Sequence, residues 1–146
     1  MRRLLVIEDG TEYEEFARLF LADCFAVSAA HSAREALAAL AQDAADALLV
    51  DLRFERSARE ALVGDVGATA ARLFGGDHAR AEAYLKEHQG TLVLAELRRA
   101  GHAQQAVFIH DFPAAQLRNL QALYAPLCAV PRFDARKVRE ALGVAP

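Results

Sequence analysis

Little in this sequence supports an extracellular, membrane or nucleic-acid function. The chain has only two cysteines, Cys24 and Cys128, with neither a Cys-x-x-Cys pair nor metal-site spacing, so we expect reduced thiols in a cytoplasmic protein. No apolar run approaches the roughly 18 residues that span a bilayer, and Glu8 and Asp9 end the first run too early for a signal peptide. Acidic residues number 20 and basic residues 17, without long blocks of either sign. We therefore expect no direct nucleic-acid binding and no membrane binding.

The composition is that of one globular domain. The 146 residues are 54% hydrophobic and 25% charged, which argues against intrinsic disorder. A chain of this length buries roughly two thirds of its unfolded surface, so it needs no disulfide or metal to fold. The 33 alanines, and 15 arginines against 2 lysines, are typical of a GC-rich bacterial coding bias and carry no mechanism.

Short apolar runs alternate with amphipathic segments along most of the chain. Strands are predicted at 3–7, 25–30, 47–50, 106–109 and 127–130, and helices at 12–23, 33–42, 91–100, 113–124 and 135–142. Strands that are apolar throughout and alternate with helices are typical of a parallel sheet covered on both faces. With right-handed crossovers, we expect a doubly wound α/β fold with a five-stranded parallel sheet.

Helix starts and helix faces follow from the same pattern. The predicted N-caps are Thr11 with Glu14, Ser32 with Glu35, Asp77 and Asp134. Two stripes of large apolar residues at helical spacing are expected in the core: Phe16, Leu19 and Phe20 in the first helix, and Leu117, Leu120 and Leu123 after Pro113.

A long segment interrupts the alternation after residue 51. We interpret residues 54–89 as a helical insertion, because helical patterns at 57–63, 67–74 and 77–88 are separated by turn residues. It has too few large apolar side chains for a core of its own, so we expect its helices to dock on the parent domain. Our hypothesis is that they pack beside the functional site and form a partner-specific surface.

Carboxylates follow two of the predicted strands at the point where each strand ends. Glu8 and Asp9 come directly after the first strand, and Asp51 follows the third. The carboxyl ends of parallel strands meet at one edge of the sheet, where the three carboxylates would repel one another unless a cation lies between them. An oxygen-seeking ion such as Mg²⁺ meets that need, and it allows one carboxylate to attack a phosphoryl donor.

Several segments resemble the receiver domain of bacterial two-component response regulators. They are residues 4–9 (LLVIED), 25–37 (FAVSAAHSAREAL), 48–52 (LLVDL) and 90–98 (GTLVLAELR), within a likeness that covers about 3–54 and 90–142. The resemblance implies one receiver-like domain over 1–146 with the flavodoxin-like strand order 2-1-3-4-5. Asp51 would be the phosphoacceptor, in a phosphorelay that uses Mg²⁺ or Mn²⁺. The implied metal ligands are Glu8, Asp9, Asp51 and the backbone carbonyl of Arg53. The implied partners are a sensor histidine kinase or phosphotransfer protein and a downstream protein.

The sequence departs from the receiver pattern where the family binds phosphate and relays its signal. His110, or Asp111 with a one-residue shift, stands where receivers have Thr or Ser, and Arg132 stands near the usual Lys. A protonated His110 could donate a hydrogen bond to a phosphoryl group, and Arg132 would keep the positive charge. The family's aromatic residue in the fifth strand is replaced by Ala129, and its Pro after the phosphoacceptor is missing.

These departures leave a second interpretation open, a pseudo-receiver that keeps the fold as an interaction module without phosphorylation. An enzyme with turnover is not expected. No glycine-rich nucleotide loop follows the first strand, and Arg53 stands where a phosphohydrolase or metal nuclease would need a second acid.

Overall fold

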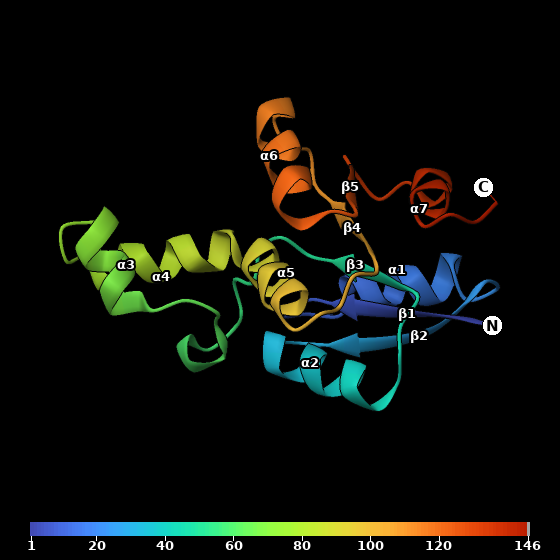
Figure 1. Ribbon diagram of the computed structural model, residues 1–146, viewed down its shortest axis with the longest axis horizontal. Coiled ribbons are helices and arrows are strands. Elements are labelled where there is room, and N and C mark those ends of the chain that lie inside the picture. Colours follow the sequence, from blue (N-terminus) through green and yellow to red (C-terminus); the bar gives the residue numbers. More distant parts are fainter. Residues whose placement is uncertain (146) are drawn as a thin grey trace.

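The computed structural model describes residues 1–145, which form a five-stranded, wholly parallel sheet in the order β2-β1-β3-β4-β5 (Figure 1). The strands are β1 (Arg2–Ile7), β2 (Phe25–Ala30), β3 (Ala47–Val50), β4 (Gln105–Ile109) and β5 (Leu127–Val130). Each lies within one residue of its predicted position, because each is a short apolar run that ends at a polar or turn-forming residue. The predicted fold class and strand order are confirmed.

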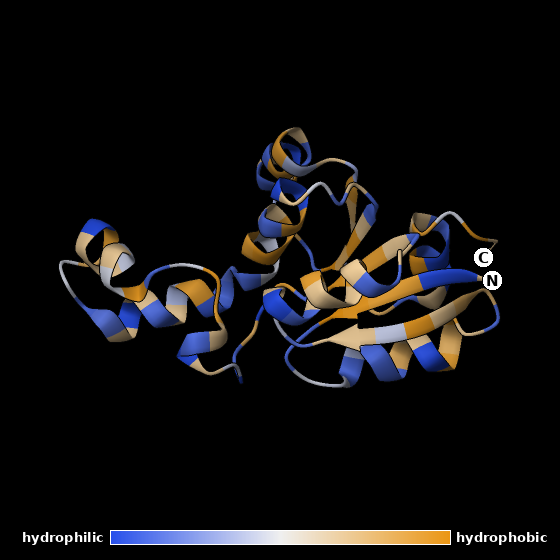
Figure 2. Cartoon of the chain, turned by 60° about the horizontal axis from the view of Figure 1, so that its bottom comes forward, coloured by the Kyte–Doolittle hydropathy of each residue, from blue (hydrophilic) through white to orange (hydrophobic). Residues whose placement is uncertain are grey.

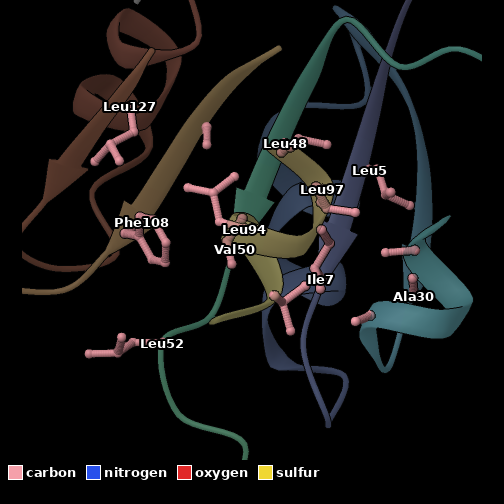
Figure 3. Close-up of a cluster of buried hydrophobic side chains, with 14 of the residues drawn as sticks. Leu5, Ile7, Ala30, Leu48, Val50, Leu52, Leu94, Leu97, Phe108 and Leu127 are labelled. Atoms are coloured by element: carbon pink, nitrogen blue, oxygen red, sulfur yellow. The ribbon is translucent and has the colours of Figure 1, made fainter. Parts of the chain in front are cut away.

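Helices cover both faces of the sheet. Successive side chains of a strand point to opposite faces, so Leu4 and Val6 pack in one apolar cluster and Leu5 and Ile7 in another. The first face is covered by α1 (Glu12–Phe20) and α7 (Ala135–Ala141), and the second by α2 (Ala33–Gln42), α5 (Gln89–Arg99) and α6 (Ala114–Tyr124). Figure 3 shows Leu94 and Leu97 of α5 over β1 and β3. In Figure 2 the strands are mostly hydrophobic, and the helices carry the hydrophilic residues.

The buried face of α1 differs from the predicted one. Tyr13 and Ala17 are its buried residues, in register with Leu21 just after it. Leu19 is 74% exposed and Phe20 45% exposed, so the predicted core stripe is wrong at these two residues, whereas Phe16 packs against the core. The stripe of α6 is also wrong in part, because Leu123 is 69% exposed. The predicted stripes were chosen for their large apolar side chains. The face that is actually buried has the spacing i, i+4, i+8, and its middle residue, the small Ala17, lets α1 approach the sheet closely.

The predicted N-caps hold at three of the four helices. Side-chain oxygens of Ser32, Asp77 and Asp134 each accept a hydrogen bond from the backbone N–H three residues on. Thr11 makes no such bond, and its predicted role is wrong. The first turn of α1 is instead capped by Glu8, whose position at the end of β1 lets its carboxylate reach the helix start.

The insertion forms a short 3-10 turn, η1 (Arg59–Ala61), and two helices, α3 (Val66–Leu73) and α4 (His78–Glu87). The helices pack on each other around a small cluster of buried residues: Val66, Ala70, Ala81 and Leu85. Figure 1 shows this hairpin beyond the carboxyl ends of the strands, away from the two termini. The hairpin contacts the parent domain through Leu92 of α5, which packs against this cluster, but no residue of α3 or α4 lines the pocket that holds Asp9 and Asp51. The expectation that these helices pack beside the functional site is therefore wrong.

Close contacts hold the two ends of the insertion at the end of β3, where the N–H of Phe54 donates to the carbonyl of Lys86. The Gln89 side chain, 1% exposed, donates hydrogen bonds to the carbonyls of Val63 and Leu85 and accepts one from the N–H of Val63. Gly90 donates its N–H to the carbonyl of Leu52. A Cβ at Gly90 would lie 2.1 Å from the carbonyl oxygen of Asp51, so only glycine lets α5 approach the end of β3 this closely.

The cysteines and the hydropathy of the helices can be compared with the sequence predictions. Cys24 and Cys128 are free cysteines, as predicted from their spacing. In residues 1–145, none of the helices has the length and hydropathy of a membrane span.

Candidate functional site

An open pocket of about 300 Å³ lies at the carboxyl edge of the sheet. Its lining residues come from the segments that follow β1, β3 and β5 and from the first turn of α1: Asp9, Glu12, Tyr13, Asp51, Arg53, Glu55, Arg56 and Phe133. Adjacent parallel strands bring Asp9 and Asp51 to this edge, because β1 and β3 pair in register from Leu4 with Ala47 to Ile7 with Val50. The pocket is mainly acidic, with two arginines, Arg53 and Arg56, from the segment that follows β3.

Asp51 is the half-buried acid at the centre of this site. Its Oδ1 accepts a 3.3 Å hydrogen bond from the backbone N–H of Arg53. Burial raises the pKa of Asp51 to about 6, and the charges of Asp9 and Glu8 raise it too, against the lowering effect of the Arg53 N–H. Asp51 is thus more basic than an ordinary aspartate and still mostly ionised at neutral pH.

Glu8 is directed away from the pocket and into α1. Its two carboxylate oxygens accept hydrogen bonds from the backbone N–H groups of Tyr13, at 3.0 Å, and Glu14, at 2.7 Å. The side chain is 1% exposed, and burial raises its pKa even though both N–H groups lower it. Glu8 therefore holds the start of α1 and does not line the pocket.

Asp9 is bound to the insertion. Its Oδ2 accepts a 2.6 Å hydrogen bond from the backbone N–H of Arg56. The Arg56 guanidinium forms an ion pair with Glu12 and lies over Gly10, where a Cβ would be 2.1 Å from one guanidinium nitrogen. This pair lowers the pKa of Glu12 to about 2. The loop that follows β3, rather than the α3–α4 hairpin, is thus the part of the insertion in contact with the site.

Tyr13 lines the pocket from α1. Its side chain is 8% exposed, its hydroxyl donates a 3.0 Å hydrogen bond to the carbonyl of Ile109, and its ring lies edge-on to Phe133 with centroids 4.9 Å apart. Burial raises the pKa of Tyr13, and the nearby negative charge of Asp51 raises it further. The hydroxyl therefore has the Ile109 carbonyl as its acceptor, and it belongs to a residue that lines the same pocket as the Asp51 carboxylate.

The two predicted phosphate-contact residues do not line the pocket. His110 follows β4, and its ring packs edge-on to Phe112 at 4.6 Å between centroids. Burial lowers the pKa of His110, and the nearby charge of Arg53 lowers it further, which disfavours the protonated donor that the sequence suggested. Arg132 is exposed, whereas its neighbour Phe133 turns towards Tyr13.

The residues present fit a hard divalent cation only in part. Asp9 and Asp51 line one pocket and repel each other, and Arg53 stands beside them, so two carboxylates and a carbonyl could serve as ligands. Glu8 would not be a ligand in this arrangement. Among residues 1–145 no group of three or more His, Cys, Asp or Glu side chains is placed to hold a metal ion.

Comparison with known proteins bears on this geometry. No protein-family model matches the sequence, and no curated protein matches it either. The structure is similar to the receiver domain of NtrX from Brucella abortus (TM-score 0.60, 17% identity, 97% of this chain and 99% of that one). It is also similar to a CheY-like response regulator receiver domain protein from Methanospirillum hungatei (TM-score 0.61, 13% identity, 98% and 94%).

The chain has the fold of a receiver domain. A receiver domain from a Francisella response regulator gives a similar result, with a TM-score of 0.59 and 12% identity over 98% of this chain and 94% of the other. The chain spans only 27% of a longer NtrX structure from Brucella abortus. At these identities the comparisons concern the fold, so the chemistry of this receiver fold has to be argued from its own residues.

Sequence reasoning missed five lining residues of this receiver fold: Glu12, Tyr13, Glu55, Arg56 and Phe133. A signal existed for Tyr13, because it starts the i, i+4 stripe with Ala17 and follows the acid pair by one helical turn. Arg56 and Phe133 lie in loops, where no periodicity indicates which side chain turns inward.

Proposed function

We propose that this protein is a signalling receiver whose Asp51 accepts a phosphoryl group. One observation carries the proposal: at the carboxyl end of β3, Asp51 lies in an open acidic pocket beside Asp9, with its pKa raised to about 6. A carboxylate that is ionised at neutral pH yet more basic than usual is a suitable nucleophile for phosphorus. The receiver fold supports the same assignment.

The transfer balances with a histidine kinase, a phosphotransfer protein or acetyl phosphate as donor. A carboxylate oxygen of Asp51 forms the new P–O bond while the donor's P–N or P–O bond breaks. The bonding pair leaves with the imidazole, which takes up a proton, or with acetate. The product is an aspartyl phosphate, in which about one to two negative charges on the phosphoryl oxygens replace the single charge of the carboxylate.

Asp9, Asp51 and the Arg53 carbonyl would hold the divalent cation that this transfer needs. Mg²⁺ or Mn²⁺, when bound, would neutralise charge on the phosphoryl oxygens. Glu8 acts on the site without lining the pocket. Its negative charge raises the pKa of Asp51, and its carboxylate holds the backbone N–H groups of Tyr13 and Glu14. Millimolar Mg²⁺ should raise the melting temperature by binding to the native state. The Asp9→Asn variant should show little of this increase, and an equal increase would remove Asp9 from the ligand set.

Signalling would proceed through contact with a protein partner. Exposed apolar side chains stand next to the pocket, among them Leu19, Phe20 and Phe133. Large apolar residues exposed together are typical of protein-binding surfaces.

Intact-mass spectrometry after treatment with acetyl phosphate and Mg²⁺ tests the proposal. One phosphoryl group should be added to the wild type and none to Asp51→Asn. Asp111→Asn is the matched control, because Asp111 is an exposed acid outside the pocket, and it should be modified like the wild type. Equal modification of Asp51→Asn and the wild type would contradict the proposal.

A specific observation favours the pseudo-receiver as a second candidate. Both oxygens of Glu8 and one of Asp9 already accept backbone N–H groups, and His110 and Arg132 do not line the pocket. In this case the protein would bind its partner without phosphorylation. No adduct and no fluoroberyllate binding at any Mg²⁺ concentration would favour this candidate.

A further inference from the structure

The phosphoryl site proposed above has no hydroxyl at the end of β4, but one reaches that place from another element. The hydroxyl of Tyr13 donates to the carbonyl of Ile109, the last residue of β4, at 3.0 Å. Tyr13 belongs to the first turn of α1 and lines the same pocket as Asp51. A buried O–H donor thus stands at the edge of the pocket.

The position of Tyr13 is fixed from two sides. Its backbone N–H is bound by the carboxylate of Glu8, and its ring packs against Phe133. The side chain has only 8% of its surface exposed, which leaves its ring little room to turn out into solvent. Rotation of the hydroxyl about its C–O bond redirects the proton while the ring stays in place.

A phosphoryl group on Asp51 would change the competition for this single proton. In the structure its acceptor is a neutral backbone carbonyl, that of Ile109, while the Asp51 carboxylate in the same pocket accepts the Arg53 N–H. Phosphorylation adds three strong acceptor oxygens with about one to two negative charges. Hydrogen bonds to charged acceptors are roughly twice as strong as those between neutral groups, so the hydroxyl should donate its hydrogen bond to the phosphoryl group.

We propose that the Tyr13 hydroxyl binds the phosphoryl group on Asp51 and leaves the Ile109 carbonyl when it does so. The inference rests on the proposed phosphorylation of Asp51. It assigns to a residue of α1 the contact for which His110 and Arg132 were predicted.

Ring contacts connect Tyr13 to the surface of the protein. The Phe133 residue is 49% exposed, and its ring contacts the rings of both Tyr13 and Phe16. The centroids of the Phe133 and Phe16 rings are 5.1 Å apart. Phe16 in turn contacts Phe20, 45% exposed, at 5.2 Å. Tyr13 is therefore the buried end of an aromatic row whose other members reach solvent.

Fluoroberyllate binding in the presence of Mg²⁺ tests the assignment, since it mimics the phosphoryl group. The Tyr13→Phe variant keeps the ring and removes only the hydroxyl, and it should bind fluoroberyllate about tenfold more weakly than the wild type. The matched control is Tyr84→Phe, in the α3–α4 hairpin, which should bind like the wild type. Equal affinity of Tyr13→Phe and the wild type would overturn the inference and leave the proposed function intact.

A second measurement needs no variant. In the wild type, the ¹³Cζ NMR signal of Tyr13 should shift when fluoroberyllate is added, because its hydroxyl changes acceptor, while Tyr84 and Tyr124 serve as internal controls. Binding of fluoroberyllate without a shift at Tyr13 would contradict the inference. If the wild type neither binds fluoroberyllate nor accepts a phosphoryl group, the proposed function and the inference fail together.

Discussion

Replacement of Glu8 by alanine should destabilise the protein far more than replacement of Thr11, although Thr11 has the sequence signature of the N-cap. The Glu8 carboxylate is 1% exposed and accepts the N–H groups of Tyr13 and Glu14 at 3.0 and 2.7 Å. Removing it leaves two donors at the start of α1 without partners, and each buried orphan costs about 1–3 kcal/mol. Two effects reduce this cost: water can enter the space left by the side chain, and the protein no longer has to bury a charge. We therefore expect the free energy of unfolding to fall by about 2–4 kcal/mol.

The matched variant is Thr11→Ala. Its exposed hydroxyl bonds only to the Glu15 carboxylate, so its removal should cost under about 0.5 kcal/mol. Urea unfolding followed by circular dichroism measures both, with an unchanged denaturant slope as the check that the unfolded state is comparable. If Thr11→Ala costs as much as Glu8→Ala, the assignment of the cap to Glu8 is refuted.

Two further predictions concern the end of β3. The pKa of Asp51 is raised from 3.8 to about 6, so its share of folding stability is present below about pH 4 and is lost as the pH rises to about 6. Without metal, Asp51→Asn should therefore be more stable than the wild type at pH 7 by about 1–2 kcal/mol, a figure reduced for partial exposure, and the gain should vanish near pH 4. Thermal unfolding in EDTA across this range checks it, and a gain that grows towards acid pH would contradict the sign. A Cβ at Gly90 would meet backbone atoms of Asp51 and Leu52 at 2.1 and 2.8 Å, so Gly90→Ala should cost about 3 kcal/mol. The control Gly75→Ala has open space and a φ of +58°, and it should cost only about 1 kcal/mol in the same assay; the reverse order would refute the close approach.

The fold could be predicted from the sequence because its strands are short apolar runs with clear ends. The run Leu48, Leu49 and Val50 before Asp51 indicates a fully buried strand, and no competing pattern overlaps it. The core face of α1 could not be predicted from side-chain size. Leu19 and Phe20 are large but exposed, whereas the small Ala17 is buried because α1 lies close to the sheet. The packing of the α3–α4 hairpin could not be predicted either. Its apolar residues can be identified in the sequence, but the sequence does not show which other element buries them.

The candidate site was predictable where parallel strands bring residues together. Asp9 and Asp51 meet at one edge because their strands are neighbours, a consequence of strand order alone. Glu8 shows why adjacency in sequence is insufficient, because neighbouring residues of a strand point to opposite sides and this carboxylate enters α1. Arg56 and Phe133 lie in the pocket through tertiary contacts for which the sequence has no periodic signal.

Chemical localisation of the phosphoryl group tests the central claim most directly. After treatment with acetyl phosphate and Mg²⁺, borohydride reduces an aspartyl phosphate to the corresponding alcohol, and peptide mass spectrometry identifies the modified residue. We expect the reduced residue at position 51, and no reduced residue at Asp9, Glu8 or Asp111. Modification at another acid, or no modification while a known receiver domain treated in parallel is modified, would contradict the claim that Asp51 is the phosphoacceptor.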